Sequence, residues 1–428
     1  MNDERAQVFR QRRFGIFLHW GLYSLAARHE WMRHDERTSD AEYQRYFDHF
    51  DPDLYDPAEW ASAIEAAGAR YAVVTTKHHE GFCLWDSRLT DYAAPHTPYG
   101  RDLIAPLVRE LRARDLGVGF YHSLIDWHHP HFPIDGLHPL RDDAEALSGQ
   151  DQRDMAVYRS YLHGQVRELL SEYGPLDQMW FDFSYPNHVH KGVKVWGGKG
   201  PEDWGSRQLM AMVRELQPGA LVNDRLGIDG DFITPEQYQP AEQLARDGRP
   251  VLWEACQTLN GSWGYHRDNR EFKPVDLLLR MLVDTVSKDG NLLLNVGPTG
   301  RGEFDPVARR TLAEIGTWMA RHGRSIYGAG PSAFTPPPDC RYTQRGDRLY
   351  LHLFAWPFET VHLPGLADRV AYAQFLHDAS QVLPELGEQG EPNMTASGAP
   401  APGTLTLQLP VRRPDVQIPV IELFLRPS

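Results

Sequence analysis

The fold of this chain is decided around residues 176–184, which read LDQMWFDFS. This run is short, apolar and bounded by turn-forming residues, which predicts a buried strand. Because side chains alternate between the two faces of a strand, Trp180 and Asp182 would share the face opposite to Phe181. An unpaired buried carboxylate costs free energy. Asp182 is therefore either a catalytic group or a cap for the following segment, and this strand alone leaves both interpretations open.

Similar apolar runs recur through the first three quarters of the chain and alternate with stretches of helical periodicity. Strands are predicted at 13–21, 70–77, 116–123, 177–184, 220–227, 250–256 and 291–296. Helices are predicted at 56–68, 103–115, 155–173, 203–216, 274–288 and 306–322. Two of these helices open on an Asp-Pro pair, a common helix start. Alternation at this length implies a parallel sheet with helical crossovers.

The alternation predicts an α/β fold, a (β/α)8-like barrel, irregular in places, that spans residues 1–328. Seven strands are recognisable, so the eighth is an assumption. A doubly wound sheet is the alternative architecture. That fold would place a glycine-rich phosphate loop after its first strand, and His19-Trp20-Gly21 stands there instead.

The pattern changes beyond a proline-rich break at 329–338, which we interpret as a linker. Short apolar runs with no helix between them follow at 348–356, 359–363, 370–375, 404–409 and 420–425. They predict a small C-terminal antiparallel β-sandwich over residues 339–428. Residues 385–404 are rich in Gly, Pro, Glu and Ala and are expected to form a loop.

Bulk composition narrows the class of protein. A chain of 428 residues with net charge −14 is long enough for two domains, and its charge argues against nucleic acid and against an anionic membrane surface. Three scattered cysteines predict neither a disulfide framework nor a cysteine zinc site. No run has the length of a membrane span, and the N-terminus has no apolar signal segment. We expect a cytoplasmic protein, either a monomer or a homo-oligomer.

Polar side chains follow most of the predicted strands at the point where each strand ends. In parallel barrels these carboxyl ends form the active site. The groups placed there are His19 and Trp20, then His78, His79 and Glu80, then Tyr121, His122 and Ser123, then Asp182, then Asn223, Asp224 and Arg225, and finally Trp253 and Glu254. One polar strand end has a trivial explanation, but their convergence predicts a site.

Two of these groups are carboxylic acids, Asp182 and Glu254, which could face a common centre. Paired acids are typical of glycosidic bond hydrolysis, in which one attacks or stabilises and the other donates a proton. The indole of Trp253 could desolvate Glu254 and keep it protonated. The alternative for Glu254 is an ion pair with Arg225.

The histidines His19, His78 and His79 allow a second chemistry, because three imidazoles could hold a metal ion. Metal-dependent barrel hydrolases often need two histidines on the first strand, and here that strand offers His19 alone. Neutral histidines can instead hydrogen-bond sugar hydroxyls. The chain has no GxSxG motif, and its cysteines have no evident base partner.

Taken together, these motifs resemble the α-L-fucosidases of glycoside hydrolase family 29, in order from about Arg13 to Gly328. The matching stretches are FGIFLHWG (14–21), HEWM (29–32), TTKHHEGFCLWDS (75–87), GFYHSLIDW (119–127), MWFDF (179–183), VNDRLG (222–227), WEACQTLNGSWGY (253–265) and GNLLLNVGPTGRG (290–302). One departure is Phe183, which stands where the family's nucleophile motif usually has glycine.

The resemblance implies a retaining exo-α-L-fucosidase of fucose metabolism, with a TIM barrel, a β-sandwich and no metal or other cofactor. It implies that Asp182 is the nucleophile and Glu254 the acid/base, with a carboxyl separation of about 5–5.5 Å. The residues expected to hold fucose are His19, Glu30, Trp31, His78, His79, Tyr121 and Arg225. The expected substrate is a fucosylated oligosaccharide or glycoconjugate. The alternatives are a transfucosidase, a metal-dependent barrel hydrolase and a non-catalytic fucose-binding protein.

Overall fold

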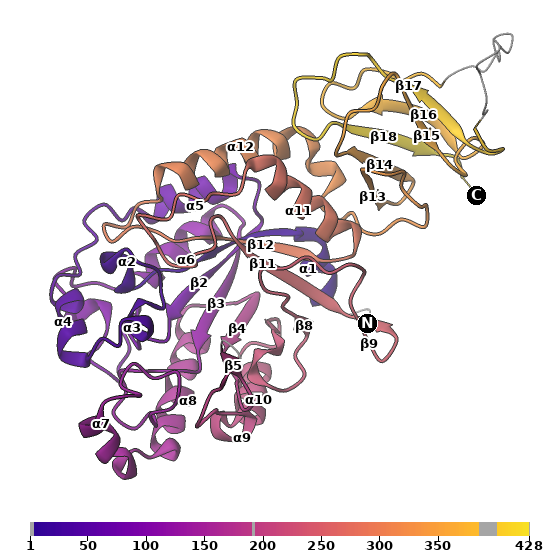
Figure 1. Cartoon of the computed structure of the whole chain (residues 1–428). Helices are drawn as coiled ribbons and strands as arrows, with labels where there is room; N and C mark the ends of the chain where they lie inside the picture. Colours follow the sequence, from indigo (N-terminus) through magenta and orange to yellow (C-terminus); the bar gives the residue numbers. More distant parts are fainter. Residues whose placement is uncertain (1–3, 191–192, 385–399, 428) are drawn as a thin grey trace, which may run out of the picture.

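The computed structural model describes residues 4–190, 193–384 and 400–427 of the chain. Eight parallel strands form one sheet in the order β7-β4-β3-β2-β1-β12-β11-β8, which Figure 1 shows fanning around a common centre. Their bounds are β1 (Phe14–Leu18), β2 (Tyr71–Lys77), β3 (Gly117–Ser123), β4 (Gln178–Asp182), β7 (Leu221–Val222), β8 (Phe232–Ile233), β11 (Leu252–Thr258) and β12 (Asn291–Val296). The predicted (β/α)8-like barrel is confirmed, and the doubly wound alternative is not.

The two end strands of the sheet, β7 and β8, come close enough to nearly close the barrel. An isolated bridge joins Asn223 to Phe232, and the backbone N–H of Asp231 donates to the carbonyl of Val222 at 2.7 Å. The Asp231 carboxylate accepts a second hydrogen bond from the Val222 N–H, also at 2.7 Å. Side-chain and backbone contacts thus hold together two strands that are each only two residues long.

The strand β8 supplies the eighth strand, which the apolar pattern does not reveal. It stops before Pro235, which has no N–H to donate to a neighbouring strand. Its pairing with β11 joins Phe232 to Leu252, and the same register resumes beyond the proline as a bridge between Glu236 and Cys256. The chain after β8 therefore carries Glu236 to the height of Cys256 in the barrel.

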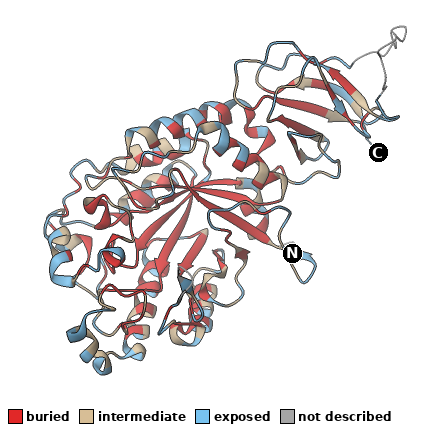
Figure 2. Cartoon of the chain, in the orientation of Figure 1, coloured by how far each residue is buried: buried red, intermediate tan, exposed pale blue. Residues whose placement is uncertain are grey.

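Helices cover the outside of the barrel, so its strands are buried, apart from the partly exposed Ile233 of β8, while the helices expose one side (Figure 2). The outer helices are α5 (Pro57–Ala66), α6 (Ile104–Ala113), α8 (Met155–Glu172), α10 (Ser206–Leu216), α11 (Val275–Ser287) and α12 (Pro306–His322). The Asp-Pro starts behave as predicted, since Asp56 caps α5 and Asp305 caps α12. Between β7 and β11, where every residue is described, no α-helix intervenes, which makes the barrel irregular.

Shorter helices and strands connect the barrel strands and the outer helices. The helix α1 (Glu4–Arg12) closes the N-terminal end, where Ala6 and Phe9 join the apolar barrel interior. The predicted helix 203–216 is divided at Gly205, whose φ of 62° is left-handed, into α9 (Pro201–Trp204) and α10. The remaining pieces are α2 (Tyr23–Ala26), α3 (Met32–Asp35), α4 (Asp40–Asp48), α7 (Ala144–Ser148), η1 (Ala94–His96), η2 (Gln150–Gln152), η3 (Asp224–Leu226), η4 (Gly323–Ser325), β5 (Val189–His190), β6 (Val193–Lys194), β9 (Ala245–Arg246) and β10 (Arg249–Pro250).

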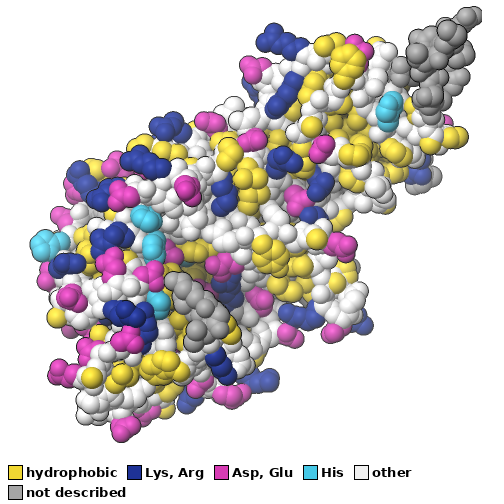
Figure 3. All heavy atoms as spheres, in the orientation of Figure 1, with side chains coloured by type: hydrophobic (Ala, Val, Ile, Leu, Met, Phe, Trp, Pro, Cys, Tyr) yellow, Lys and Arg dark blue, Asp and Glu magenta, His cyan; other side chains and the backbone are white. Residues whose placement is uncertain are grey.

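The C-terminal strands form a separate pair of antiparallel sheets, as predicted, beyond α11 and α12 in Figure 1. One sheet contains β13 (Cys340–Arg345), β14 (Arg348–Leu353), β18 (Val420–Leu425) and β16 (Val370–Phe375), and the other contains β15 (Thr360–Leu363) and β17 (Leu405–Gln408). Most of the predicted loop 385–404 lies outside the described residues. Figure 3 shows hydrophobic side chains gathered on the face of this unit that it draws. Phe358, in the same unit, is exposed.

The proposed boundaries of the two domains and their linker stay a prediction. Across the part of the chain that is described, no helix is long and apolar enough to cross a membrane.

Candidate active site

The carboxyl ends of the barrel strands surround a small cavity. The cavity is lined by Phe17, His19, Trp31, His78, His79, Tyr121, Trp180, Asp182, Phe183, Arg225, Glu236, Cys256 and Trp263. The lining includes Asp182 and six of the seven residues predicted to hold the sugar, so the structure brings together most of the predicted site.

Asp182 is the last residue of β4, and its side chain is only 11% exposed. Its Oδ2 accepts a hydrogen bond from the Tyr121 hydroxyl at 2.8 Å, and its Oδ1 lies 2.9 Å from Nη1 of Arg225. Burial and the negative charge of Asp182 both raise the pKa of Tyr121, which keeps that hydroxyl a donor. Both carboxylate oxygens are thus held by donors from other strand ends rather than by the segment that follows.

Arg225 links Asp182 to a second carboxylate. Its Nη1 lies 2.9 Å from Asp182 Oδ1 and 2.7 Å from Glu236 Oε2, so these two oxygens are at most the sum of the two distances apart, about 5.6 Å. Burial opposes the charge of Arg225, but Glu236 and Asp182 more than compensate and raise its pKa. The guanidinium is fixed further by Thr234, whose Oγ1 accepts from Nε at 2.9 Å.

Glu236 is a residue of the cavity lining that the sequence interpretation missed. It follows the two-residue strand β8, and its side chain is 40% exposed, beside the deeply buried Asp182. One signal could have found it. Residues 228–249 separate two predicted strands without helical periodicity, so the missing eighth strand had to lie there and its end had to contribute to the site.

Glu254 does not line the cavity that contains Asp182. The prediction that these two acids face a common centre is therefore wrong. The strand β11 continues to Thr258, so Glu254 lies near its beginning, one inward-facing residue below Cys256. Its side chain is fully buried and lies beneath Trp180, whose Nε1 donates to Oε1 at 3.0 Å. Trp253 points away from the barrel interior and donates to the carbonyl of Lys288. The alternative ion pair with Arg225 is not formed either, since Arg225 binds Glu236.

The histidines line the cavity as neutral groups. Burial lowers the pKa of His19 to about 3, and it also lowers the pKa values of His78 and His79. His19 Nδ1 donates to Asn295 Oδ1 at 2.7 Å, and His79 Nδ1 lies 2.6 Å from Ser123 Oγ. The strand β2 ends at Lys77, so two consecutive histidines beyond it can face one cavity. Among the described residues, no group of three or more His, Cys, Asp and Glu side chains is placed to hold a metal ion.

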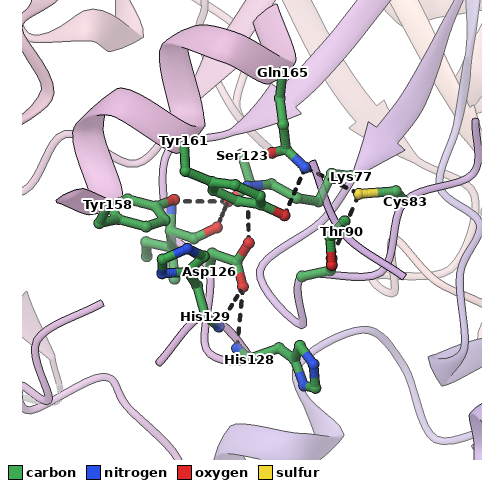
Figure 4. Close-up of polar contacts among 12 residues, drawn as sticks. Lys77, Cys83, Thr90, Ser123, Asp126, His128, His129, Tyr158, Tyr161 and Gln165 are labelled. Atoms are coloured by element: carbon green, nitrogen blue, oxygen red, sulfur yellow. Dashed lines mark hydrogen bonds and ion pairs between the residues drawn. The ribbon is translucent and has the colours of Figure 1, made fainter. Parts of the chain in front are cut away.

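A buried ion pair between Lys77 and Asp126, both drawn in Figure 4, involves the residue that directly precedes His78 and His79 in the chain. Lys77 Nζ lies 3.1 Å from Asp126 Oδ2, and both side chains are almost completely buried. The other oxygen of Asp126 accepts from the backbone N–H groups of His128 and His129. The neighbouring Trp127 N–H donates to the His79 carbonyl at 2.8 Å. The pair therefore ties the end of β2 to the loop after β3.

Phe183 occupies the position where glycine was expected, and its backbone explains that expectation. Its φ of 75° lies in the left-handed region, which costs a non-glycine residue roughly 1–2 kcal/mol. Its ring packs at centroid distances of 5.3 Å from Trp31 and 4.9 Å from His79, on the wall of the cavity. The side chain thus supplies aromatic contact at a position where the backbone favours glycine.

Glu30 lies behind this wall rather than in the cavity lining. Its Oε2 accepts from the backbone N–H of Gly264 at 2.7 Å, next to the lining residue Trp263. Burial raises the pKa of Glu30 to about 7. Its predicted role in holding the sugar stays a prediction.

Comparisons with known proteins point to a single family. The family model for α-L-fucosidase matches residues 1–324. The human plasma α-L-fucosidase is 30% identical over 384 residues, which cover 82% of this chain and 76% of the human protein. The structure is similar to α-L-fucosidase isoenzyme 1 from Paenibacillus thiaminolyticus, with 44% identity, a TM-score of 0.91 and 99% of each chain covered.

A third relative adds a chemical observation. A GH29 α-L-fucosidase from Bacteroides thetaiotaomicron is 26% identical, with a TM-score of 0.83 and with 100% of this chain and 97% of that chain covered. Its structure shows a covalent intermediate, trapped from 2-fluoro-fucosyl fluoride in a glutamate-to-glutamine variant. The family model and the human relative place the whole barrel in one family. The chain belongs to the α-L-fucosidases of glycoside hydrolase family 29, and it is an α-L-fucosidase.

Proposed function

We propose that this protein releases terminal α-L-fucose from fucosylated glycans with retention of anomeric configuration, with Asp182 as the nucleophile and Glu236 as the acid/base. The observation that carries this assignment is the shared nitrogen of Arg225, which limits the separation of the two carboxylate oxygens to about 5.6 Å. Retaining glycosidases place their carboxyl groups about 5–5.5 Å apart, whereas inverting enzymes need roughly 6.5 Å or more. The covalent intermediate of the Bacteroides thetaiotaomicron relative supports the same mechanism.

In the first step, Asp182 attacks the anomeric carbon while the bond from that carbon to the leaving oxygen breaks. Protonated Glu236 gives its proton to the leaving oxygen and becomes a carboxylate. Arg225 and Tyr121 hold the attacking carboxylate in place, which lowers the entropic cost of reaching the transition state. The greater exposure of Glu236 suits its role, because the leaving group departs toward solvent.

In the second step, a water molecule attacks the same carbon and displaces Asp182 as a carboxylate. Glu236 accepts the proton of that water and returns to its starting state. The change of role follows from microscopic reversibility, because the second step is the reverse of the first with water in place of the leaving group.

The remaining lining suits a single deoxy sugar. Neutral imidazoles can donate to hydroxyls and accept from them, while the rings of Trp31, Phe183 and Trp263 present apolar faces. Both features suit the recognition of one terminal sugar and favour an exo-acting enzyme.

The assignment is tested by comparing Asp182→Gly with Glu236→Ala on an aryl fucoside and on a fucosylated disaccharide. We expect Asp182→Gly to lose turnover and to recover part of it with azide, yielding a fucosyl azide of inverted configuration. Glu236→Ala should lose far more activity on the disaccharide than on the aryl fucoside, whose leaving group needs no proton. Equal losses on both substrates would refute the acid/base role, and full activity of Asp182→Gly would refute the nucleophile.

A further inference from the structure

Glu254 is a carboxylate at the floor of the barrel without a direct part in the proposed mechanism. It is fully buried, and three donors from two other strands surround it. Tyr71 and Gln178 donate to Oε2, and Trp180 Nε1 donates to Oε1 at 3.0 Å. Among the described residues, Glu254 has no cationic side chain as an ion-pair partner. A buried acid without a cation is costly, so its presence at this place calls for a function.

The indole that Glu254 holds lies directly under the proposed catalytic groups. The guanidinium carbon of Arg225 lies 4.7 Å from the centre of the Trp180 ring. The ring of Tyr121 stacks on the same indole, with a centroid distance of 6.2 Å. Arg225 and Tyr121 are the two side chains that hydrogen-bond Asp182, and Arg225 also binds Glu236. The orientation of one indole therefore affects both donors.

We propose that Glu254 is a positioning residue, which fixes the Trp180 ring as the platform that aligns Arg225 and Tyr121 with Asp182. The inference rests on the proposed function of Asp182 and Glu236. A glutamine at position 254 has one acceptor oxygen, and the two donors Tyr71 and Gln178 favour its orientation toward them, so its NH2 group faces the indole N–H. Without an acceptor for its N–H, the indole can rotate or shift, and the guanidinium above it loses its cation–π contact. A small displacement of the nucleophile is enough to slow the reaction strongly.

The chain contains a matched control for this arrangement. Glu168, on α8, is also a buried carboxylate that accepts from an indole, because Trp85 Nε1 donates to its Oε2 at 3.2 Å. Its other partners are Ser87, the backbone of Arg88 and the Arg88 guanidinium, whose Nε lies 3.8 Å from Oε1, and it does not line the cavity. Glu168→Gln therefore changes a buried carboxylate that accepts from an indole without disturbing Trp180.

The test is a double-mutant cycle with Glu254→Gln and Trp180→Phe, measured on an aryl fucoside and a fucosylated disaccharide, with Glu168→Gln in parallel. Each single change at the floor should lower kcat roughly 10- to 100-fold, with KM within about threefold, because neither alters a group that reacts. Both substrates should be affected by the same factor. The double variant should be no slower than the slower single variant, because Glu254 acts through Trp180. Glu168→Gln should keep the wild-type kcat.

Three results would overturn the inference. Additive losses in the double variant would separate Glu254 from Trp180. A greater loss on the disaccharide than on the aryl fucoside would make Glu254 a proton donor. Loss of kcat in Glu168→Gln as large as in Glu254→Gln would reduce the effect to general destabilisation.

If Glu254→Gln does not fold, Trp180→Phe still tests the inference, since an unchanged kcat in that variant would contradict the role of the Trp180 ring as a platform. A wild-type protein that releases no fucose, or inverts the anomer, refutes the proposed function instead.

Discussion

Asp182 and Glu236 bind the same nitrogen of Arg225, at 2.9 Å and 2.7 Å. One acid that ends β4 and one that follows β8 are thereby held close enough for both to reach the same sugar ring. A single cation limits their repulsion, so both can be close to one anomeric carbon. Arg225 therefore orients both acids in addition to its predicted contact with the substrate.

Replacing Arg225 with lysine should lower kcat/KM by roughly 100-fold, because an ammonium lacks the planar fork that reaches Asp182, Glu236 and Thr234 together. Steady-state kinetics on an aryl fucoside measure this loss. Arg341→Lys is the control, since Arg341 pairs with Asp284 on α11 and should keep its activity. Wild-type kinetics in Arg225→Lys would show that the bridge is dispensable.

Phe183→Gly should be more stable than Phe183→Ala by about 1 kcal/mol, because both lose the ring but only alanine keeps the left-handed strain. The free energy of unfolding from chemical denaturation measures this difference. The order should reverse at Tyr372, a partly exposed position in β16, where glycine weakens a strand. Alanine equal to glycine at position 183 would mean that the backbone relaxes.

Acid should weaken the contact between α12 and the C-terminal sheets. Burial lowers the pKa of His322 to about 4 and that of His352 to about 3, whereas both would titrate near 6.5 in the unfolded chain. The unfolded state therefore binds more protons below pH 6.5, and stability falls as the pH is lowered toward these folded values. Each histidine contributes at most about 1.4 kcal/mol per pH unit. Thermal melts between pH 7 and pH 4 measure the slope.

A variant isolates one of these two groups. His352→Gln should flatten the dependence of stability on pH, because it removes a buried titrating ring that contacts Thr343. An unchanged slope in His352→Gln would place the acid sensitivity elsewhere.

Treatment with a chelator should leave kcat and KM unchanged, in contrast to a metal-dependent barrel hydrolase. His19 and His79 already use one ring nitrogen each in hydrogen bonds to Asn295 and Ser123. Activity after dialysis against EDTA, followed by readdition of zinc or magnesium, measures this outcome. A loss that the metal restores would support the metal-dependent alternative.

The linear sequence determined most of this molecule. Alternating apolar runs predict the barrel, and the helix caps at Asp56 and Asp305 lie where their motifs indicate. Polar strand ends also identify the correct edge of the sheet, including Asp182 and the histidines. These features are local, because the identity of a few neighbouring residues decides whether a segment can form a buried strand or begin a helix.

The choice of the second acid was decided only by the tertiary structure. Glu254 belongs to a buried strand of seven residues whose apolar pattern is easy to recognise in the sequence. Glu236 follows a strand of two residues, which is too short to show any periodicity. Where β11 ends, and at which height each acid lies, depends on the register with neighbouring strands. Register arises from pairing between segments far apart in the chain, so Arg225 could bring Glu236 to Asp182 while Glu254 remained under Trp180.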